Sequence, residues 1–369
     1  MRGNFRVIIS GGGTGGHIFP AISIADAIKR LYPDSEILFV GALGKMEMER
    51  VPAAGYEIAG LPVAGLKRKL DIENFKLPFK LLRSLKMAGK IIDDFKPDVV
   101  VGVGGYASGP MLWMAGQRGI PYLIQEQNSY AGITNRILGR RAKKICVAYE
   151  GMERFFSGNK ILITGNPVRA GIVEPTKEMK DAAIEFFGLD PQKRTILVVG
   201  GSLGARTLNN CVKKWITNNT ESEIQIIWQY GKFYKADVTG FMEKNRRDYV
   251  KESEFIKRMD YAFAAADVVI TRAGAGTISE LCIAKKACIF VPSPNVTEDH
   301  QTHNAMALVN KKAALLVEDT EAEKRLMDIA ATLAEDPKRV AEMEKNISGL
   351  AYRNSAEIIA KEVINLIAQ

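Results

Sequence analysis

Long apolar runs are missing from this sequence. No stretch approaches the roughly 18 apolar residues that a helix needs to cross a bilayer. A secretory signal is also lacking, because the chain enters a short apolar segment, residues 5–10, almost at once. We therefore expect no membrane-spanning helix and no removable leader, and a protein that works in the cytoplasm.

Cysteine and metal-ligand patterns are equally sparse. The chain has four cysteines, none in a CxxC pair and each among apolar residues: Cys146, Cys211, Cys282 and Cys288. This usage is typical of buried thiols in a reducing compartment. Neither a disulfide framework nor a zinc site is indicated, and no other metal-ligand spacing or low-complexity segment occurs.

Positive charge is what the sequence has in excess. The formal net charge of +9 favours an anionic partner such as nucleic acid, anionic lipid or a phosphorylated substrate. A nucleic-acid-binding module is one alternative. It is disfavoured because no aromatic stacking platform is present and the charge gathers near one amphipathic segment.

Residues 272–280, Arg-Ala-Gly-Ala-Gly-Thr-Ile-Ser-Glu, carry the first specific signal. They lie between an apolar strand pattern at 267–270 and a helix pattern from Leu281. A Gly-rich turn at the start of a helix exposes backbone N–H groups where a phosphate can bind. Glu280 follows about one turn later, where a carboxylate can hold the hydroxyls of a ribose. These features favour a nucleoside diphosphate as the ligand. The alternative is an ordinary turn with a solvated glutamate.

A second Gly-rich run, residues 11–16, follows the first strand pattern. Gly11, Gly13 and Gly16 fit the GxGxxG spacing of NAD-binding proteins. That ligand needs an acid at the end of the second strand, and residues 36–40 run into Gly-Ala-Leu-Gly instead. His17 ends the run and is a candidate general base, because histidine titrates near neutral pH. Its alternative role is helix capping or packing.

Residues 67–90 are the strongest local charge feature. A helix is predicted from Pro78, with Leu81, Leu82, Leu85, Ala88 and Ile92 on one face and with Lys80, Arg83, Lys86 and Lys90 on the other. Phe79 and Met87 fall on the basic side. A basic face that carries exposed apolar residues suits an anionic membrane surface, although a solvated surface helix is the plainer alternative.

Strand and helix patterns alternate through both halves of the chain. Further strands are expected at 97–102, 120–124, 145–148 and 161–164, and then at 194–199, 224–228, 254–256, 267–270 and 287–291. Residues 165–169 interrupt the pattern as a hinge would, and residues 200–205 repeat the Gly-rich turn after the first strand of the second half. The expected fold class is α/β: two Rossmann-like, doubly wound parallel-sheet domains facing a cleft.

Seven motifs together resemble one family. They occupy residues 12–20, 104–110, 126–128, 165–169, 200–205, 272–280 and 300–305, in the family's order and over nearly the whole chain. The sequence is thereby similar to the MurG family of peptidoglycan N-acetylglucosaminyltransferases, which are glycosyltransferases of the two-Rossmann GT-B type.

The resemblance implies an inverting transfer of N-acetylglucosamine from UDP-N-acetylglucosamine to the 4-hydroxyl of the muramoyl sugar of undecaprenyl-linked lipid I, giving lipid II. It implies an N-terminal acceptor- and membrane-binding domain, residues 1–166, on which a C-terminal helix at 352–369 packs. Residues 167–351 would bind the UDP-sugar. The enzyme would sit peripherally on the cytoplasmic face of the cell membrane, on an anionic surface. Other cell-wall synthesis proteins are its expected partners.

The resemblance also assigns site residues. His17 would be the catalytic base, with Glu126 as the second candidate. The donor would contact Thr14, Gly15, Gly16, Asn128, Arg169, Ser202, Ile256 (through its backbone), Arg272, Ala275, Gly276, Thr277, Glu280, His300 and Gln301. The acceptor diphosphate would contact Gly13, Gly104, Gly105, Tyr106 and Ser108. The membrane would contact Phe79, Lys80, Arg83, Lys86, Met87 and Lys90. The chain has no DxD motif, so no metal and no cofactor are expected.

Two other activities fit the same fold at this stage: a glycolipid glucosyltransferase and a UDP-N-acetylglucosamine 2-epimerase. The epimerase would need additional catalytic carboxylates and no membrane patch.

Overall fold

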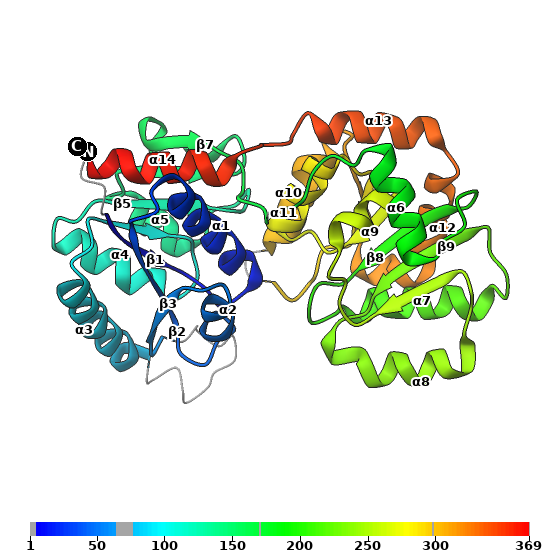
Figure 1. The fold of residues 1–369 in the computed structure, drawn as a ribbon, viewed down its shortest axis with the longest axis horizontal. Coiled ribbons are helices and arrows are strands. Elements are labelled where there is room, and N and C mark those ends of the chain that lie inside the picture. Colours follow the sequence, from blue (N-terminus) through cyan, green and yellow to red (C-terminus); the bar gives the residue numbers. More distant parts are fainter. Residues whose placement is uncertain (1–4, 64–76, 170, 297–298, 369) are drawn as a thin grey trace. The chain divides into compact units, whose positions relative to one another are not determined.

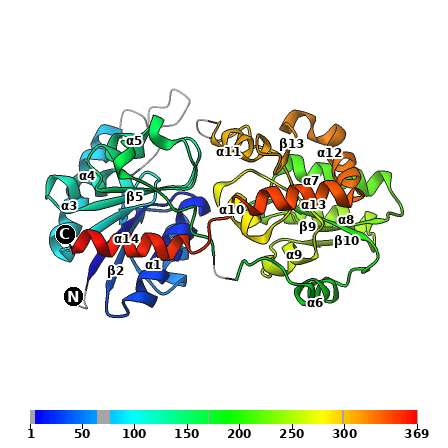
Figure 2. The same ribbon diagram turned by 90° about the horizontal axis from the view of Figure 1, so that it is seen from above.

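The chain forms two compact units. The computed structural model describes residues 5–63, 77–169, 171–296 and 299–368. Residues up to 170, together with 352–369, form the N-terminal unit, and residues 171–351 form the C-terminal unit. The division falls at residue 170, against the 166 expected from the sequence. Figures 1 and 2 show the red C-terminal helix alongside blue α1, in the N-terminal unit.

The N-terminal unit is built on a seven-stranded parallel sheet of order β3-β2-β1-β4-β5-β6-β7. Its strands are β1 Arg6–Ser10, β2 Glu36–Ala42, β3 Glu57–Leu61, β4 Val99–Gly102, β5 Tyr122–Glu126, β6 Lys144–Val147 and β7 Ile161–Ile163. Its α-helices are α1 Gly15–Leu31, α2 Glu47–Ala53, α3 Leu77–Phe95, α4 Ser108–Gln117, α5 Ile133–Gly139 and α14 Ser355–Ile367. Two 3₁₀ turns, Met152–Arg154 and Gly158–Lys160, precede β7.

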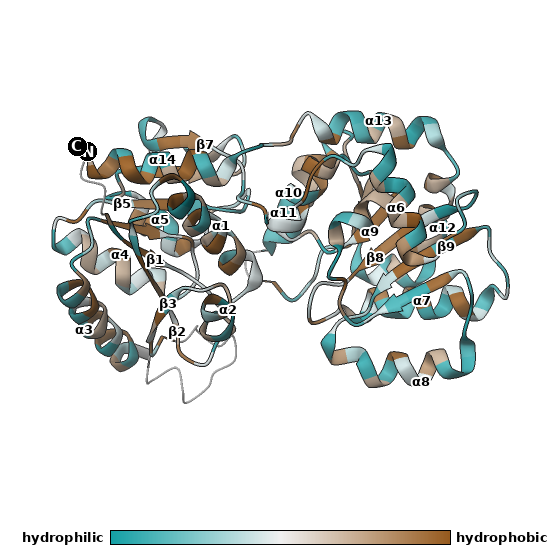
Figure 3. Cartoon of the chain, in the orientation of Figure 1, coloured by the Kyte–Doolittle hydropathy of each residue, from teal (hydrophilic) through white to brown (hydrophobic). Residues whose placement is uncertain are grey.

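Alternate residues of β1 build two cores, because successive side chains of a strand point to opposite faces. Val7 and Ile9 join the core that α1 and α14 cover, whereas Ile8 joins the core beneath α3 and α4. Burial on both faces explains why the strands read as continuous apolar runs. The strands are correspondingly brown in Figure 3.

The C-terminal unit repeats the plan with a six-stranded parallel sheet of order β10-β9-β8-β11-β12-β13. Its strands are β8 Arg194–Val199, β9 Ile224–Gln229, β10 Val250–Ser253, β11 Val268–Thr271, β12 Cys288–Phe290 and β13 Leu315–Leu316. Its α-helices are α6 Lys177–Phe187, α7 Arg206–Asn218, α8 Lys235–Asn245, α9 Met259–Ala265, α10 Ala275–Ala284, α11 His300–Val309, α12 Asp319–Ala334 and α13 Pro337–Ser348.

The predicted fold class, two Rossmann-like parallel sheets, is confirmed, with local corrections. Helix α1 begins at Gly15, directly within the Gly-rich run, so Pro20 lies inside the helix. The strand expected at 254–256 lies at 250–253, and β3 and β13 were not predicted. Strand β13 has only two residues, too few to produce a recognisable apolar alternation.

No helix in the described part of the chain is long and apolar enough to cross a membrane.

Candidate active site

In both sheets the strand order reverses beside the first strand of the unit. Strand β1 pairs with β2 on one side and β4 on the other, and β8 pairs in the same way with β9 and β11. Ligands of open parallel sheets bind outside the carboxyl ends of the strands at such switch points. Four Gly-rich segments follow the switch-point strands β1, β4, β8 and β11: residues 11–14, 103–107, 200–205 and 272–274.

The first loop of the N-terminal unit is braced by a buried carboxylate that we did not identify from the sequence. Glu47 is 1% exposed and accepts hydrogen bonds from the backbone nitrogens of Gly13 and Ala42, both at 2.9 Å. The Gly13 amide is thus already engaged, and with a negative group. The contact of Gly13 with the acceptor diphosphate stays a prediction, and its amide would have to exchange Glu47 for the ligand. An acid does lie beyond β2, but it holds this loop instead of a ribose.

The two Gly-rich loops of this unit pack against each other through their backbones. Gly12 N donates to Gly104 O at 3.3 Å, and a methyl group on Gly105 would lie 2.3 Å from Gly12 O. Gly104 and Gly105 also have φ of +89° and +83°, which favours glycine. The close backbone contact is thus one reason why glycine occupies these positions.

The loop after β4 places its two polar side chains differently. Ser108 is fully buried and its hydroxyl donates to Gly105 O at 2.9 Å, so a contact between this side chain and a diphosphate is not supported. Tyr106, by contrast, is exposed at the surface.

His17 lies in the first turn of α1, beside the second loop. Thr14 is the N-cap residue, and its hydroxyl lies 3.1 Å from His17 Nδ1 instead of capping a backbone amide. A methyl group on Gly104 would lie 2.9 Å from His17 Nε2 and Cδ2. The imidazole is therefore held between its own helix start and the Gly104 backbone, and it is half-buried.

The carboxylate of Glu126, the second candidate base, is buried and hydrogen-bonded within the N-terminal unit. Its carboxylate is 2% exposed, and it accepts from Asn128 N at 3.0 Å, Gly132 N at 3.2 Å and Asn135 Nδ2 at 2.8 Å. Asn128 Nδ2 is a fourth donor, at 3.3 Å. Burial raises the pKa of Glu126 above its ordinary value, although these N–H donors oppose the shift. With both oxygens occupied by N–H donors, Glu126 shapes the loop, and the choice of His17 or Glu126 as base stays a prediction.

Gln127 is a second residue that the sequence pattern did not single out. It is 2% exposed, and its Nε2 donates to Val103 O at 2.7 Å and to Gln125 Oε1. Its Oε1 is buried without a hydrogen-bond partner among the described residues. A methyl group on Gly104 would lie 3.6 Å from this oxygen. A buried, unpaired carbonyl thus borders the Gly104 backbone on which His17 rests.

The loop after β8 in the C-terminal unit is held from behind by Gln229. The Gln229 side chain donates from Nε2 to Gly201 O at 3.1 Å and accepts at Oε1 from Ile256 N at 2.9 Å. The Ile256 amide is therefore engaged, and only its carbonyl can take the role predicted for this backbone. Ser202, predicted to contact phosphate, is exposed on the loop.

Arg272 has a structural role that its position in the motif did not predict. Its Nη1 donates to Val291 O at 2.9 Å and Pro292 O at 3.1 Å, and it forms an ion pair with Asp319 at the start of α12. Asp319 Oδ2 also accepts from Thr207 Oγ1 at 3.0 Å. The guanidinium ties the ends of β11 and β12 to α12, and its contact with the donor stays a prediction.

Helix α10 opens on small residues without a side-chain cap. Gly274 is the N-cap, and Ala275, Gly276 and Thr277 form the first turn, which contains no acid. The first amides of a helix have no intrahelical partner and attract anions. Glu280, in the second turn, is 8% exposed. The predicted phosphate and ribose positions thus lie on the same helix.

Gln301, near the start of α11, is partly engaged. Its Oε1 accepts from Ser293 N at 2.8 Å and so fixes the preceding loop, which leaves the Nε2 end for a sugar hydroxyl. His300 is the first residue of the same helix.

The predicted donor residues divide between the units. Thr14, Gly15, Gly16, Asn128 and Arg169 belong to the N-terminal unit, and the others belong to the C-terminal unit. Within the described ranges, no three His, Cys, Asp or Glu side chains gather in a group that could hold a metal ion.

The predicted membrane helix α3 presents a different face from the one expected. Phe79, Leu81 and Leu82 are 75%, 51% and 64% exposed, whereas Ser84, Ala88 and Ile92 are buried. Met87 is half-buried and packs against the core of the unit, so less of it is available to a membrane than of Phe79. The exposed apolar residues therefore lie at the start of the helix, next to Lys80 and Arg83. The basic residues at 67–69 lie outside the described residues.

Family models match both units. The glycosyltransferase family 28 N-terminal domain matches residues 7–147, and the C-terminal domain of that family matches residues 195–362. The crystal structure of Acinetobacter baumannii MurG is similar, with a TM-score of 0.77 and 28% identity over 98% of this chain and 99% of that chain. A UDP-N-acetylglucosamine 2-epimerase structure shares the fold, at a TM-score of 0.63 and 14% identity, over 99% of this chain and 96% of the other.

Curated relatives cover nearly the whole chain. A protein of Parabacteroides distasonis is 55% identical over 98% of this chain and 98% of its own length. A protein of Phocaeicola vulgatus is 56% identical over 99% of this chain and 97% of its own length. Both bear the name UDP-N-acetylglucosamine–N-acetylmuramyl-(pentapeptide) pyrophosphoryl-undecaprenol N-acetylglucosamine transferase. At this identity and coverage, the chain belongs to that family of glycosyltransferases.

Proposed function

We propose that this protein transfers N-acetylglucosamine from UDP-N-acetylglucosamine to the muramoyl 4-hydroxyl of an undecaprenyl-diphosphate-linked N-acetylmuramyl-pentapeptide, with inversion at the anomeric carbon. The observation that carries the proposal is the full-length match to relatives named for this reaction. The arrangement at the switch points supports it, because each unit presents a Gly-rich loop and a helix start there.

The C-terminal unit binds the donor. The first turn of α10, Ala275 to Thr277, and the loop at Ser202 take the diphosphate through backbone amides and the serine hydroxyl. Glu280 accepts hydrogen bonds from the ribose hydroxyls, and the Ile256 carbonyl faces uracil. The same amides stabilise the negative charge that develops on the leaving UDP, and the reaction therefore needs no metal or cofactor. The sugar hydroxyls are read by His300, by Gln301 through its Nε2 and by Asn128.

His17 is the general base. In-line attack by the acceptor hydroxyl requires a group that accepts its proton, and a half-buried imidazole is suited to this near neutral pH. In the tautomer whose Nδ1–H donates to the Thr14 hydroxyl, Nε2 is the nitrogen that takes the proton. Glu126 is not needed as a base.

The acceptor brings the protein to a membrane. A lipid-linked substrate cannot leave the bilayer, so the enzyme binds there peripherally, on the cytoplasmic, anionic surface. Phe79, Leu81 and Leu82 would enter the interface while Lys80 and Arg83 meet the headgroups.

Transfer of radiolabelled N-acetylglucosamine to a short-chain lipid I analogue tests the proposal. We expect His17→Ala to lower kcat by about 10²- to 10⁴-fold, the range for loss of a general base, with UDP affinity unchanged. Glu280→Ala should weaken UDP binding instead. Glu126→Gln distinguishes the two bases, because a structural Glu126 predicts lower stability and no change in the pH profile of kcat.

Folded parent enzyme that binds UDP but transfers nothing to the analogue would overturn the acceptor assignment. Release of N-acetylmannosamine from donor alone would show an epimerase instead.

A further inference from the structure

The side chain of Gln127 ends a chain of buried amides in the N-terminal unit. Asn166 Nδ2 donates to Gln127 O at 3.0 Å, and Gln125 Nε2 donates to Asn166 Oδ1 at 2.9 Å. Gln127 Nε2 in turn donates to Gln125 Oε1 and, at 2.7 Å, to Val103 O. Two backbone carbonyls, which can only accept hydrogen bonds, therefore fix which end of each amide carries the nitrogen.

This orientation leaves Gln127 Oε1 outside the amide network. Among the described residues the oxygen has no hydrogen-bond partner, although the side chain is only 2% exposed. Turning the amide round would place its oxygen against Val103 O, so that two acceptors would face each other. A buried acceptor without a donor is costly and calls for an explanation such as a role in the reaction. The network thus holds one polar oxygen ready for a donor or a positive charge.

Gly104 brings this oxygen close to His17. A methyl group on Gly104 would lie 2.9 Å from His17 Nε2 and Cδ2, and 3.6 Å from Gln127 Oε1. The imidazole edge and the amide oxygen therefore both lie within 3.6 Å of one point, and residue 104 places no side chain of its own there. The negative end of the Gln127 dipole is thus near the ring edge that contains Nε2.

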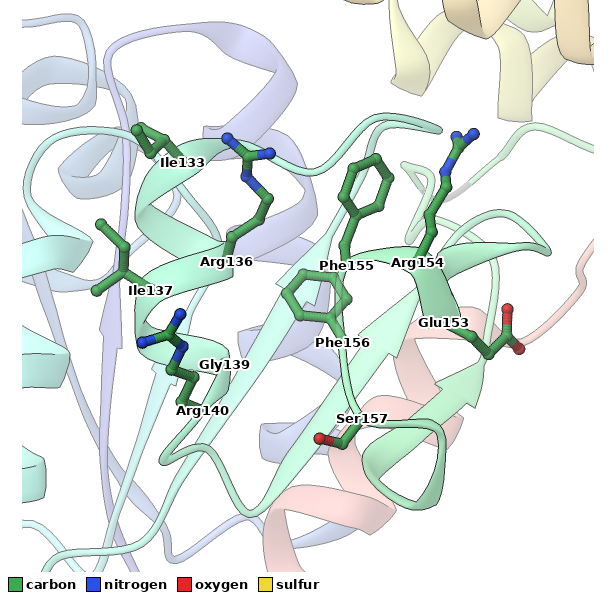
Figure 4. A pocket seen from close by; sticks show the side chains of 10 residues that line it. All are labelled: Ile133, Arg136, Ile137, Gly139, Arg140, Glu153, Arg154, Phe155, Phe156 and Ser157. Carbon is green, nitrogen blue, oxygen red and sulfur yellow. The ribbon is translucent and has the colours of Figure 1, made fainter.

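The segment that carries Gln127 is held from two further sides. Glu126, the preceding residue, accepts from Asn135 Nδ2 of α5 at 2.8 Å. Arg154, which faces α5 across the groove shown in Figure 4, donates to Ser129 O at 2.8 Å. The amide dipole is therefore fixed before any substrate binds, and a fixed dipole stabilises a charge without having to reorganise.

We propose that Gln127 is a positioning residue for the transfer reaction, whose Oε1 dipole stabilises the positive charge of His17 once this residue has taken the proton of the acceptor hydroxyl. In that step the hydroxyl oxygen bonds to the anomeric carbon, and its proton moves to His17 Nε2. The bond from the anomeric carbon to UDP breaks, and its electron pair goes to the leaving diphosphate oxygen. The role of Gln127 rests on the proposed function, in which His17 is the base.

The charge on the imidazole explains why a dipole matters here. The ring is neutral before the step and cationic after it, so a negative dipole end beside the ring favours the transition state over the ground state. The same dipole has little to act on while the ring is neutral. Gln127 therefore acts on the reaction through His17 and needs no contact with the substrate.

Two buried carboxylates belong to the same surroundings. A methyl group on Gly12, in the loop that leads into α1, would lie 2.3 Å from Glu47 Oε1, and Glu126 directly precedes Gln127. A negative charge on either would favour a cationic His17, as the amide dipole does. Because both carboxylates remain in every variant below, differences between those variants report on the amides.

Proton NMR titration of His17 tests the proposal without any acceptor. The chain has three histidines, so the signal that is lost in His17→Ala assigns the ring. Gln127→Met keeps the length of the side chain and loses the dipole, which favours the neutral ring. We expect it to lower the midpoint of the His17 titration by about 0.5 to 1 pH unit, a change of about three- to tenfold in the proton equilibrium.

Gln125→Met is the matched control. Gln125 is as buried as Gln127 and belongs to the same network, but its loss leaves the Gln127 amide bonded to Val103 O. Both variants should lower the urea midpoint of the N-terminal unit, since each leaves buried groups without a partner. Only Gln127→Met should move the His17 titration. Equal shifts in the two variants would show a structural effect of the network and overturn the proposal.

Gln127→Glu keeps an oxygen beside Gly104 and carries the test if Gln127→Met does not fold. An un-ionised glutamate can donate to Val103 O as the amide does, and an ionised one adds negative charge near the ring. The His17 midpoint should therefore equal that of the parent or exceed it. A midpoint below that of the parent would contradict the proposal.

Transfer kinetics connect the dipole to the reaction. In Gln127→Met we expect kcat to fall by about two- to tenfold and the acid limb of its pH profile to move to lower pH, while KM for UDP-N-acetylglucosamine stays within about twofold of the parent value. A raised KM with unchanged kcat would assign Gln127 to substrate binding, and the proposal fails. If the parent transfers nothing, the proposed function fails instead, and the NMR comparison still decides whether Gln127 acts on His17.

Discussion

The Gly-rich loops of the two units have similar sequences and different surroundings. In the N-terminal unit, the Gly13 amide donates to the buried carboxylate of Glu47. In the C-terminal unit, the first turn of α10 contains no acid, and the nearby Arg272 forms an ion pair with Asp319 of α12. Both α1 and α10 begin without a side-chain cap or an acid in the first turn, so the difference is the carboxylate of Glu47 beneath the first loop, which disfavours a phosphate there.

The difference shows that a Gly-rich motif specifies a turn and leaves its ligand to the surroundings. In the N-terminal unit, the glycines permit two loops to touch and place His17 against Gly104. In the C-terminal unit, the backbones of Gly204 and Gly231 also lie in close contact. The first turn of α10 remains the candidate site for the donor diphosphate. Chemistry is thus expected from the first unit and nucleotide binding from the second.

Breaking the Arg272–Asp319 ion pair should give the largest effect on stability. Both side chains are mostly buried, at 16% and 21% exposure, so Arg272→Met leaves a carboxylate with little solvent and should cost about 3–5 kcal/mol. We expect the unfolding of the C-terminal unit to shift in urea while that of the N-terminal unit does not. The pair Arg258–Asp260, whose arginine is 46% exposed, is the control, and Arg258→Gln should cost about 1 kcal/mol or less.

The same variant distinguishes a structural role of Arg272 from the predicted donor contact. A structural arginine predicts that UDP affinity, measured below the unfolding transition, stays near that of the parent. Loss of UDP binding by a fully folded Arg272→Met would instead restore the donor contact.

Removing the brace in the N-terminal unit should have a smaller effect. Glu47→Gln replaces one carboxylate oxygen by an amide nitrogen that must face a backbone N–H, so one buried donor loses its acceptor. We expect a cost of about 1–3 kcal/mol, confined to the N-terminal unit, and lower kcat because His17 follows this loop. Exposed Glu49→Gln, on the same helix, is the matched control. A fall in donor affinity without a change in kcat would contradict this reading.

The residues that escaped sequence analysis share a physical reason. The turns were predictable because strand, glycine and helix signals are local. The partners of those turns were not: Glu47 lies 34 residues from Gly13, Gln229 lies 27 from Ile256, and Asp319 lies 47 from Arg272. Nothing local shows that Ile256 N or Arg272 Nη1 is already satisfied. The prediction of which face of α3 is exposed failed for the same reason. Helix α3 packs against α4, and Ser84 and Ala88 are buried.

The four cysteines give the smallest expected effect on stability, and their reactivity allows the two units to be compared directly. Burial raises the pKa of Cys211 and of Cys282 to about 12, from an ordinary value of 9.0, and raises those of Cys146 and Cys288 as well. A thiol whose folded pKa is raised stabilises the fold fully below pH 9, and this contribution is lost as pH rises from there toward 12. At pH 8.5 the native protein should therefore react with a thiol reagent only through unfolding.

Because Cys146 lies in the N-terminal unit and the other three cysteines lie in the C-terminal unit, thiol reactivity reports which unit opens. In mild urea, Glu47→Gln should speed the labelling of one thiol, and Arg272→Met the labelling of three, as counted by mass spectrometry of the intact protein. Labelling of all four at one rate in both variants would mean that the units unfold together. The contrast between the two loops would then concern binding and catalysis, and not local stability.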